Sequence, residues 1–170
     1  MRSLQGMSIL ITGGGSGIGA DCAQRFCEQG ALVTITGRRI EKLEAVQAQL
    51  GDNCRVVQGD VCQQSDRVNM IEMALAHGGG KLDALINNAA NMYRQPVDGY
   101  TEAHLSDAFN TNVISAMMLS SLAVPHLDTT YGAIVFMGST HTRRAFPGAS
   151  PYATTKAALE GLTKVMAAEL

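Results

Sequence analysis

The sequence contains no long apolar segment, no basic stripe and no close pair of cysteines. Its apolar runs fall well short of the roughly 20 residues that a membrane-spanning helix needs, so no membrane partner is expected. Adjacent basic residues occur only as the pairs Arg38–Arg39 and Arg143–Arg144, and the formal net charge is −2. This charge distribution argues against a nucleic-acid partner, which would require a basic surface.

The cysteines and histidines form no metal or redox motif. Cys22, Cys27, Cys54 and Cys62 show no CxxC spacing and no metal-ligand spacing with the four histidines. We therefore expect no metal site and reduced thiols, the usual state inside the cell. The amino terminus also lacks a signal-peptide core, because its short apolar run passes directly into a glycine cluster. Together these absences predict a cytoplasmic protein.

Short apolar runs alternate with helical patterns along the chain, which has 170 residues. The runs are nearly continuous, as expected of strands that are covered on both faces, and lie at 7–12, 31–36, 54–58, 83–87 and 132–137. Helical patterns lie at 17–29, 40–50, 64–77, 101–125 and 151–170. This alternation predicts one α/β domain, residues 1–170, with a doubly wound parallel sheet of the Rossmann type. In such sheets ligands bind beyond the carboxyl ends of the strands.

The glycine cluster after the first predicted strand has the pattern TGxxxGxG, at residues 12–19. A strand, a glycine turn and a helix in this order direct backbone N–H groups and the positive end of a helix dipole toward one point, which suits a diphosphate. Glycine permits positive φ and leaves room for the phosphates. Ala20 replaces the lysine of a P-loop, and Ile18 replaces the third glycine of GxGxxG. The alternative is a flexible loop without a ligand.

A second motif lies near the carboxyl terminus, where Tyr152 and Lys156 are four residues apart and Ser139 precedes the tyrosine by thirteen. Positions four apart share one face of a helix, so the phenol and the ammonium should point into the same space. An ammonium next to a phenol favours the phenolate. Such a tyrosine can exchange a proton with a carbonyl or alcohol oxygen. YxxxK alone is a weak signal, and the glycine cluster strengthens it.

Taken together, these motifs resemble the short-chain dehydrogenase/reductase family over residues 7–170. The independent pieces that agree are TGGGSGIG at 12–19, Asp60-Val61, NNAA at 87–90, Asn112, and Ser139 with Tyr152-x3-Lys156. The resemblance implies NAD or NADP as the hydride carrier. It also implies a catalytic set made of Asn112, Ser139, Tyr152 and Lys156.

The resemblance assigns each member of this set a role. Tyr152 exchanges a proton with the substrate oxygen while a hydride moves to or from the nicotinamide. Lys156 supports the tyrosine and hydrogen-bonds the nicotinamide ribose, and a water connects Asn112 to Lys156. Ser139 polarises the carbonyl with a neutral hydroxyl. From the residues alone, Asn112 could equally be a satisfied amide in the core, and Ser139 an ordinary serine at a strand end.

The residue after the second predicted strand indicates which cofactor binds. A carboxylate there would bind the ribose 2′-OH of NAD, but the sequence has Arg38, which suits the 2′-phosphate of NADP. NADP is therefore favoured over NAD, the alternative being solvated arginines. Asp60 should accept from the adenine amino group, and Val61 should cover the ring. The expected cofactor residues are Gly13, Gly15, Ser16, Gly17, Ile18, Gly19, Arg38, Asp60, Val61, Asn88, Ala89, Tyr152 and Lys156.

The sequence stops at Leu170, inside the last predicted helix. Members of the family typically continue with two more strands, a Pro-Gly motif beside the nicotinamide and a loop that covers the substrate. The resemblance therefore implies a chain truncated after the helix that follows the fifth strand. It also implies that the complete protein forms a homodimer or a homotetramer.

Two functions remain open on this basis. One is an oxidoreductase that transfers a hydride between NADP(H) and a small-molecule carbonyl or alcohol substrate. The other is a truncated, inactive dinucleotide-binding module that acts as a partner or sensor. The segments 91–94 and 141–146 should border the substrate pocket, with His141 as part of its wall. Neither the substrate nor the physiological direction of the reaction follows from the sequence.

Overall fold

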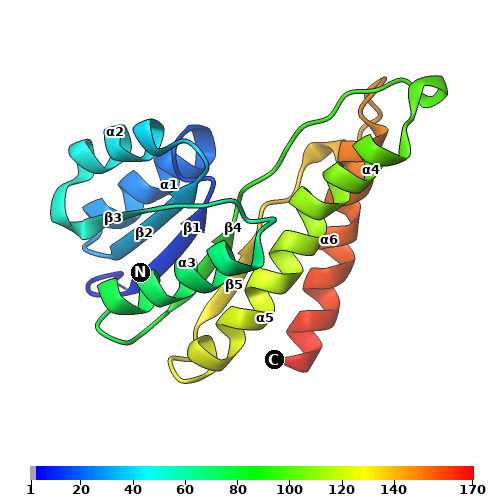
Figure 1. The fold of residues 1–170 in the computed structure, drawn as a ribbon. Coiled ribbons are helices and arrows are strands. Elements are labelled where there is room, and N and C mark those ends of the chain that lie inside the picture. The colour runs from blue at the N-terminus through cyan, green and yellow to red at the C-terminus, as the bar shows by residue number, and fades with distance from the viewer. Residues whose placement is uncertain (1–2) are drawn as a thin grey trace.

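A computed structural model describes residues 3–170, so the first two residues of the predicted domain lie outside the described residues. Five parallel strands form one sheet, flanked by helices on both faces, in the order β3-β2-β1-β4-β5 (Figure 1). The strands are β1 (Ser8–Thr12), β2 (Leu32–Gly37), β3 (Cys54–Gln58), β4 (Ala84–Asn87) and β5 (Ala133–Phe136). The chain changes direction across the sheet between β3 and β4, which confirms the doubly wound fold.

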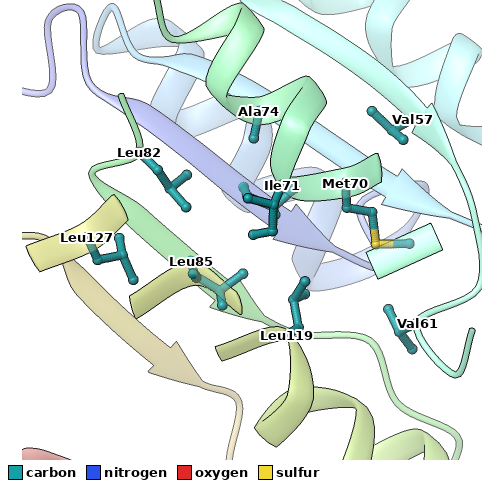
Figure 2. Packing of buried hydrophobic residues seen from close by; sticks show 11 residues of the cluster. Val57, Val61, Met70, Ile71, Ala74, Leu82, Leu85, Leu119 and Leu127 are labelled. Carbon is teal, nitrogen blue, oxygen red and sulfur yellow. The ribbon is translucent and has the colours of Figure 1, made fainter. Parts of the chain in front are cut away.

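Alternation along the central strands divides the core between the two faces of the sheet. Ile9 and Ile11 of β1 pack with α1 (Gly17–Glu28) and α2 (Ile40–Leu50). Leu10 points to the opposite face, toward α3 (Gln64–His77) and α5 (Ser115–Asp128). Figure 2 shows this second cluster, in which side chains of both helices meet those of β4. Cover on both faces explains the nearly continuous apolar runs of these strands.

The register of the sheet gathers the strand ends that carry the motifs. Thr12 pairs with Thr36 across β1 and β2, and Asn87 pairs with Phe136 across β4 and β5. Because all strands are parallel, the segments that follow them emerge at one edge of the sheet. This edge brings together the glycine turn, Arg38, Asn88 and Ser139.

Two elements differ from the sequence-based expectation. The predicted helix over 101–125 is α4 (Glu102–Phe109), a π-helical turn (Asn110–Ile114) and α5. A single π turn continues the helical path between α4 and α5, so the apolar pattern over these residues reads as one helix. The expectation that every strand is covered on both faces is wrong for β5, whose alternate residues Ala133 and Val135 are exposed. The helices on that face, α1 and α2, pack against β1 and β2 and leave these two side chains of β5 uncovered.

The core packing predicts that replacing two valines with alanine has very different effects on the free energy of unfolding. Val33 in β2 is fully buried, whereas Val97 in the segment before α4 is 76% exposed. Val33→Ala should lower the free energy of unfolding by about 2 kcal/mol, because it removes buried methyl groups and leaves a cavity. The matched control, Val97→Ala, should change it by less than about 0.5 kcal/mol. Urea unfolding of both variants measures this, and equal effects would contradict the assigned core.

Candidate active site

The turn between β1 and α1 lies directly against the residues that follow β4. Gly13 has φ of +68°, and a Cβ there would lie 3.0 Å from the Cα of Ala89. A Cβ at Gly19 would collide with the carbonyl oxygen of Gly13 and with the side chain of Asn88. Gly17, the first residue of α1, has φ of +54°. Each of these three positions therefore requires glycine, for lack of space or for positive φ.

Thr12 and Asn88 hold this turn in place. The Asn88 Nδ2 donates to the carbonyl oxygens of Thr12 at 2.9 Å and Gly13 at 3.2 Å. The Thr12 Oγ1 accepts from the backbone N–H groups of Asn88 and Ala89, both at 3.0 Å. Asn88 and Ala89 are among the predicted cofactor residues, but the sequence did not reveal that the side chains of Thr12 and Asn88 brace the turn. The one signal was a hydroxyl directly before the glycine cluster.

A cavity of about 500 Å³ opens beside this turn. The predicted cofactor residues that line it are Gly13, Gly15, Ser16, Ile18, Arg38, Val61, Asn88 and Ala89. Five other predicted residues do not line it, namely Gly17, Gly19, Asp60, Tyr152 and Lys156. Gly19 shapes the site without lining the cavity, because its lack of a side chain lets α1 approach the turn. The glycine turn therefore forms part of the wall of this cavity.

Three cationic side chains line one side of the cavity, and none of its lining residues is acidic. Arg38 and Arg39 follow β2, and Lys42 lies in the first turn of α2. Of these three residues, only Arg38 was predicted to bind the cofactor. The four-residue spacing between Arg38 and Lys42, next to the start of a helix, was a signal that could have identified Lys42. This side of the cavity suits a ligand with a phosphate group.

Asp60 lies in the tight turn after β3, between two residues that line the cavity, Gly59 and Val61. Its Oδ1 accepts from the backbone N–H of Cys62 at 3.0 Å, which leaves Oδ2 as the oxygen available to a ligand. Its own backbone N–H donates to the Asp66 carboxylate at 2.8 Å. The carboxylate of Asp60 is therefore held by its own turn, next to the cavity wall.

Tyr152 and Lys156 lie on α6 (Ser150–Glu169) and share one face of it, as their spacing predicted. The Lys156 Nζ lies over the Tyr152 ring, 5.7 Å from its centroid, and donates to the carbonyl oxygen of Met137 at 2.7 Å. Lys156 is only 3% exposed. Burial lowers the pKa of its ammonium group, because desolvation disfavours the charged form.

Ser139 follows β5, and His141 contacts both Ser139 and Tyr152. The Ser139 Oγ accepts from the backbone N–H of His141 at 3.2 Å and lies 3.1 Å from its Nδ1. The His141 ring stacks on Phe146 with centroids 4.3 Å apart. Its plane is perpendicular to that of the Tyr152 ring, with the two centroids 5.3 Å apart. One imidazole therefore contacts both the serine and the tyrosine of the predicted catalytic set.

Asn112 lies in the π-helical turn and connects three segments through its side chain. Its Oδ1 accepts from the backbone N–H of Asn91 at 2.8 Å, and its Nδ2 donates to the carbonyl of Asn91 at 2.9 Å. The same Nδ2 donates to the Thr155 Oγ1 on α6 at 3.0 Å. These bonds go to Asn91 and Thr155 and not to Lys156. Asn112 is thus a satisfied buried amide, and the contributions of Asn91 and Thr155 had no sequence signal.

The two segments expected to border the substrate pocket, 91–94 and 141–146, are each followed by a residue that joins the two loops. The backbone N–H of Gln95 donates to the carbonyl of Gly148 at 2.7 Å. Tyr100 and Ser150 are joined by their hydroxyl groups, and Tyr93 donates to the carboxylate of Asp107. The long segment between β4 and α4 is therefore fixed to both neighbouring helices.

Residues 3–170 contain no group of three or more His, Cys, Asp or Glu side chains that could hold a metal ion. Within the same residues, no helix combines the length and apolar character needed to cross a membrane.

The chain is similar in sequence to known oxidoreductases. Oxidoreductase asL5 of Sarocladium schorii is 36% identical over 171 residues, which cover 100% of this chain and 68% of that protein. Gluconate 5-dehydrogenase of Gluconobacter oxydans is 32% identical, with 98% of this chain and 66% of that protein covered. The chain spans about two thirds of the length of the curated relatives that it matches.

Solved structures share the fold over nearly the whole chain. A putative betaketoacyl-ACP reductase has a TM-score of 0.90 and 34% identity, covering 98% of this chain and 68% of its own. A Caenorhabditis elegans short-chain dehydrogenase/reductase, solved with cofactor, has a TM-score of 0.91 and 28% identity over 99% of this chain and 66% of its own. The family model described as short chain dehydrogenase matches residues 7–170. The chain therefore belongs to the short-chain dehydrogenase family.

Proposed function

We propose that the complete protein is an NADP(H)-dependent oxidoreductase that acts on a small carbonyl or alcohol compound. The observation that carries the proposal is the arrangement of Tyr152, the buried Lys156 and Ser139 at the sheet edge where the glycine turn also lies. Membership of a family that binds NAD(P) supports it further. When bound, the cofactor supplies or accepts the hydride.

The residues beside the 500 Å³ cavity fit a dinucleotide. The missing side chains at Gly13 and Gly15 leave backbone groups open at the start of α1, where the helix dipole favours a diphosphate. Val61 would cover the adenine ring, and the free Oδ2 of Asp60 would accept from its amino group. The cationic side made by Arg38, Arg39 and Lys42 would hold a 2′-phosphate, which is the reason for favouring NADP.

The substrate oxygen would lie between the hydroxyl groups of Tyr152 and Ser139. Tyr152 would exchange the proton, and Ser139 would donate a hydrogen bond that stabilises the developing charge on that oxygen. The ammonium of Lys156, which lies over the Tyr152 ring, would support this proton exchange. Asn112 would support the site by holding the segment between β4 and α4 through the backbone of Asn91. A proton relay from Asn112 to Lys156 stays a prediction.

We further propose that the complete protein is a cytoplasmic homo-oligomer, a dimer or a tetramer. All four cysteines are free thiols, which fits a reducing compartment. Met117 on α5 is 45% exposed and Val165 on α6 is 56% exposed. Apolar side chains on two neighbouring helices would suit contact with a second copy.

Replacing the proposed acid should separate chemistry from cofactor binding. Tyr152→Phe should lower turnover by a factor of about 10² to 10⁴, because it removes the transferred proton. Its Kd for NADPH, measured by nicotinamide fluorescence, should change less than about twofold because the glycine turn holds the diphosphate. The control Tyr131→Phe alters a tyrosine that is 99% exposed and should change neither value. Unchanged turnover in Tyr152→Phe would reject the role.

The cofactor preference should depend on Arg38. Arg38→Gln should weaken NADPH binding by about tenfold or more and leave NADH binding nearly unchanged, because only NADPH carries the 2′-phosphate. Arg55→Gln is the matched control, since Arg55 lies near the start of β3 and does not line the cavity. Fluorescence titration of both cofactors measures the effect. A native protein that prefers NADH would overturn the NADP assignment.

Lys156 should make stability depend on pH in a defined direction. Its pKa in the folded protein lies below the ordinary 10.5, so between these two values the unfolded chain binds more protons. Unfolding free energy should therefore rise with pH through that window, relative to Lys156→Met. Urea unfolding of both cofactor-free proteins at a pH of about 7 and about 9.5 measures the difference. If the native protein's unfolding free energy relative to Lys156→Met stays constant or falls between these pH values, the burial of a charged Lys156 is contradicted.

A further inference from the structure

We propose that His141 is a positioning residue that orients the Ser139 hydroxyl toward the substrate oxygen. The proposal rests on the proposed function, because it requires Ser139 to contact a carbonyl or alcohol group. It departs from the expectation that His141 only forms part of the pocket wall. Three observations carry it: the contact with Ser139, the packing of the ring, and a buried ring nitrogen.

The contact with Ser139 can fix the direction of its hydroxyl hydrogen. A serine hydroxyl has one hydrogen to donate and two lone pairs that accept. The backbone N–H of His141 donates to Oγ at 3.2 Å, and Nδ1 lies 3.1 Å from the same oxygen. If Nδ1 carries the ring proton, N–H donors use both lone pairs. The hydroxyl hydrogen is then free for one remaining partner, the substrate oxygen.

The second ring nitrogen indicates which tautomer is present. Nε2 of His141 is buried and has no hydrogen-bond partner among the described residues. A proton on Nε2 would be a buried donor without an acceptor, whereas a bare Nε2 is an unpaired acceptor, and folded proteins leave buried N–H donors unpaired less often than buried acceptors. A proton on Nε2 would also turn the Ser139 hydroxyl toward Nδ1 and away from the substrate. We therefore assign the proton to Nδ1, where the Ser139 oxygen accepts it.

The ring is held in this position by aromatic contacts on two sides. Phe146 stacks on it with an interplanar angle of 29°, and the Tyr152 ring lies perpendicular to it at 90°. These contacts fix the plane of the imidazole, so Nδ1 stays directed at Ser139. The same ring therefore sets the position of the proposed hydrogen-bond donor relative to the proposed acid.

Three substitutions at one position separate hydrogen bonding from packing. His141→Phe keeps an aromatic ring against Phe146 and Tyr152 but removes both nitrogens. His141→Asn places an amide near the former Nδ1, whereas His141→Gln places it near the former Nε2. His141→Phe should lower kcat about tenfold with the Kd for NADPH unchanged, because a misdirected hydroxyl weakens only the transition-state contact. His141→Asn should recover most of the loss, and His141→Gln should not.

A double-mutant cycle tests whether the effect passes through Ser139. The complete protein is assayed by NADPH oxidation with the fastest substrate from a panel of small ketones and aldehydes. In a Ser139→Ala background, His141→Phe should change kcat less than about twofold, because there is no hydroxyl left to orient. An equal loss in both backgrounds, or no loss in either, would overturn the proposal. If His141→Phe does not fold, equal kcat for the Asn and Gln variants would overturn it instead.

A spectroscopic test does not depend on turnover. Long-range ¹H–¹⁵N correlation spectra of the complete protein report which ring nitrogen of His141 carries the proton, and His141→Asn identifies the signal. We expect the Nδ1–H tautomer, and the Nε2–H tautomer would overturn the inference. Turnover that survives both Tyr152→Phe and Ser139→Ala would instead reject the proposed function. Loss in those two variants without loss in His141→Phe would reject only the role of His141.

Discussion

The hydrogen bonds of one buried amide hold the two halves of the site together. Asn112 binds both backbone groups of Asn91 and the hydroxyl of Thr155, so it joins the segment after β4 to the helix that carries Tyr152 and Lys156. It can reach both because it lies in a π-helical turn, where the local backbone departs from the α-helix between α4 and α5. Without these bonds, α6 would lose a buried polar contact with the segment between β4 and α4, and the exposed contact of Tyr100 with Ser150 would remain. The position of the tyrosine relative to the cavity would then be less firmly fixed.

Positively charged side chains lie at this edge of the sheet both in solvent and in the protein interior. Arg38, Arg39 and Lys42 are exposed at the mouth of the cavity, where solvent and salt weaken their field but a bound phosphate can meet them directly. Lys156 is buried, and its burial disfavours its own charge. A buried ammonium acts strongly on a neighbouring phenol because little water screens it. The three exposed side chains therefore suit the binding of a ligand, and the buried Lys156 suits a role beside the proton-transferring tyrosine.

Several residues shape the site without lining the cavity. Gly19 allows α1 to reach the glycine turn, Thr12 and Asn88 fix that turn against β4, and His141 contacts both Ser139 and Tyr152. In each case a side chain, or its absence, sets the position of a neighbour that would touch a ligand. Such preorganisation is how a site avoids reorganising when charge develops on the substrate.

The local patterns of the sequence were sufficient to predict the strand and helix positions, the doubly wound sheet and the shared face of Tyr152 and Lys156. These features follow from short-range periodicity and from glycine positions, which a linear sequence records directly. The sequence did not reveal the π-helical turn at Asn112 or the contacts made by Thr12, Asn91, Thr155 and His141. A five-residue π turn barely alters the apolar spacing. The partner contacts, most of which join residues far apart in the chain, exist only after the sheet has set the distances between them. Tertiary structure alone therefore decided which polar groups hold the proposed catalytic residues in place.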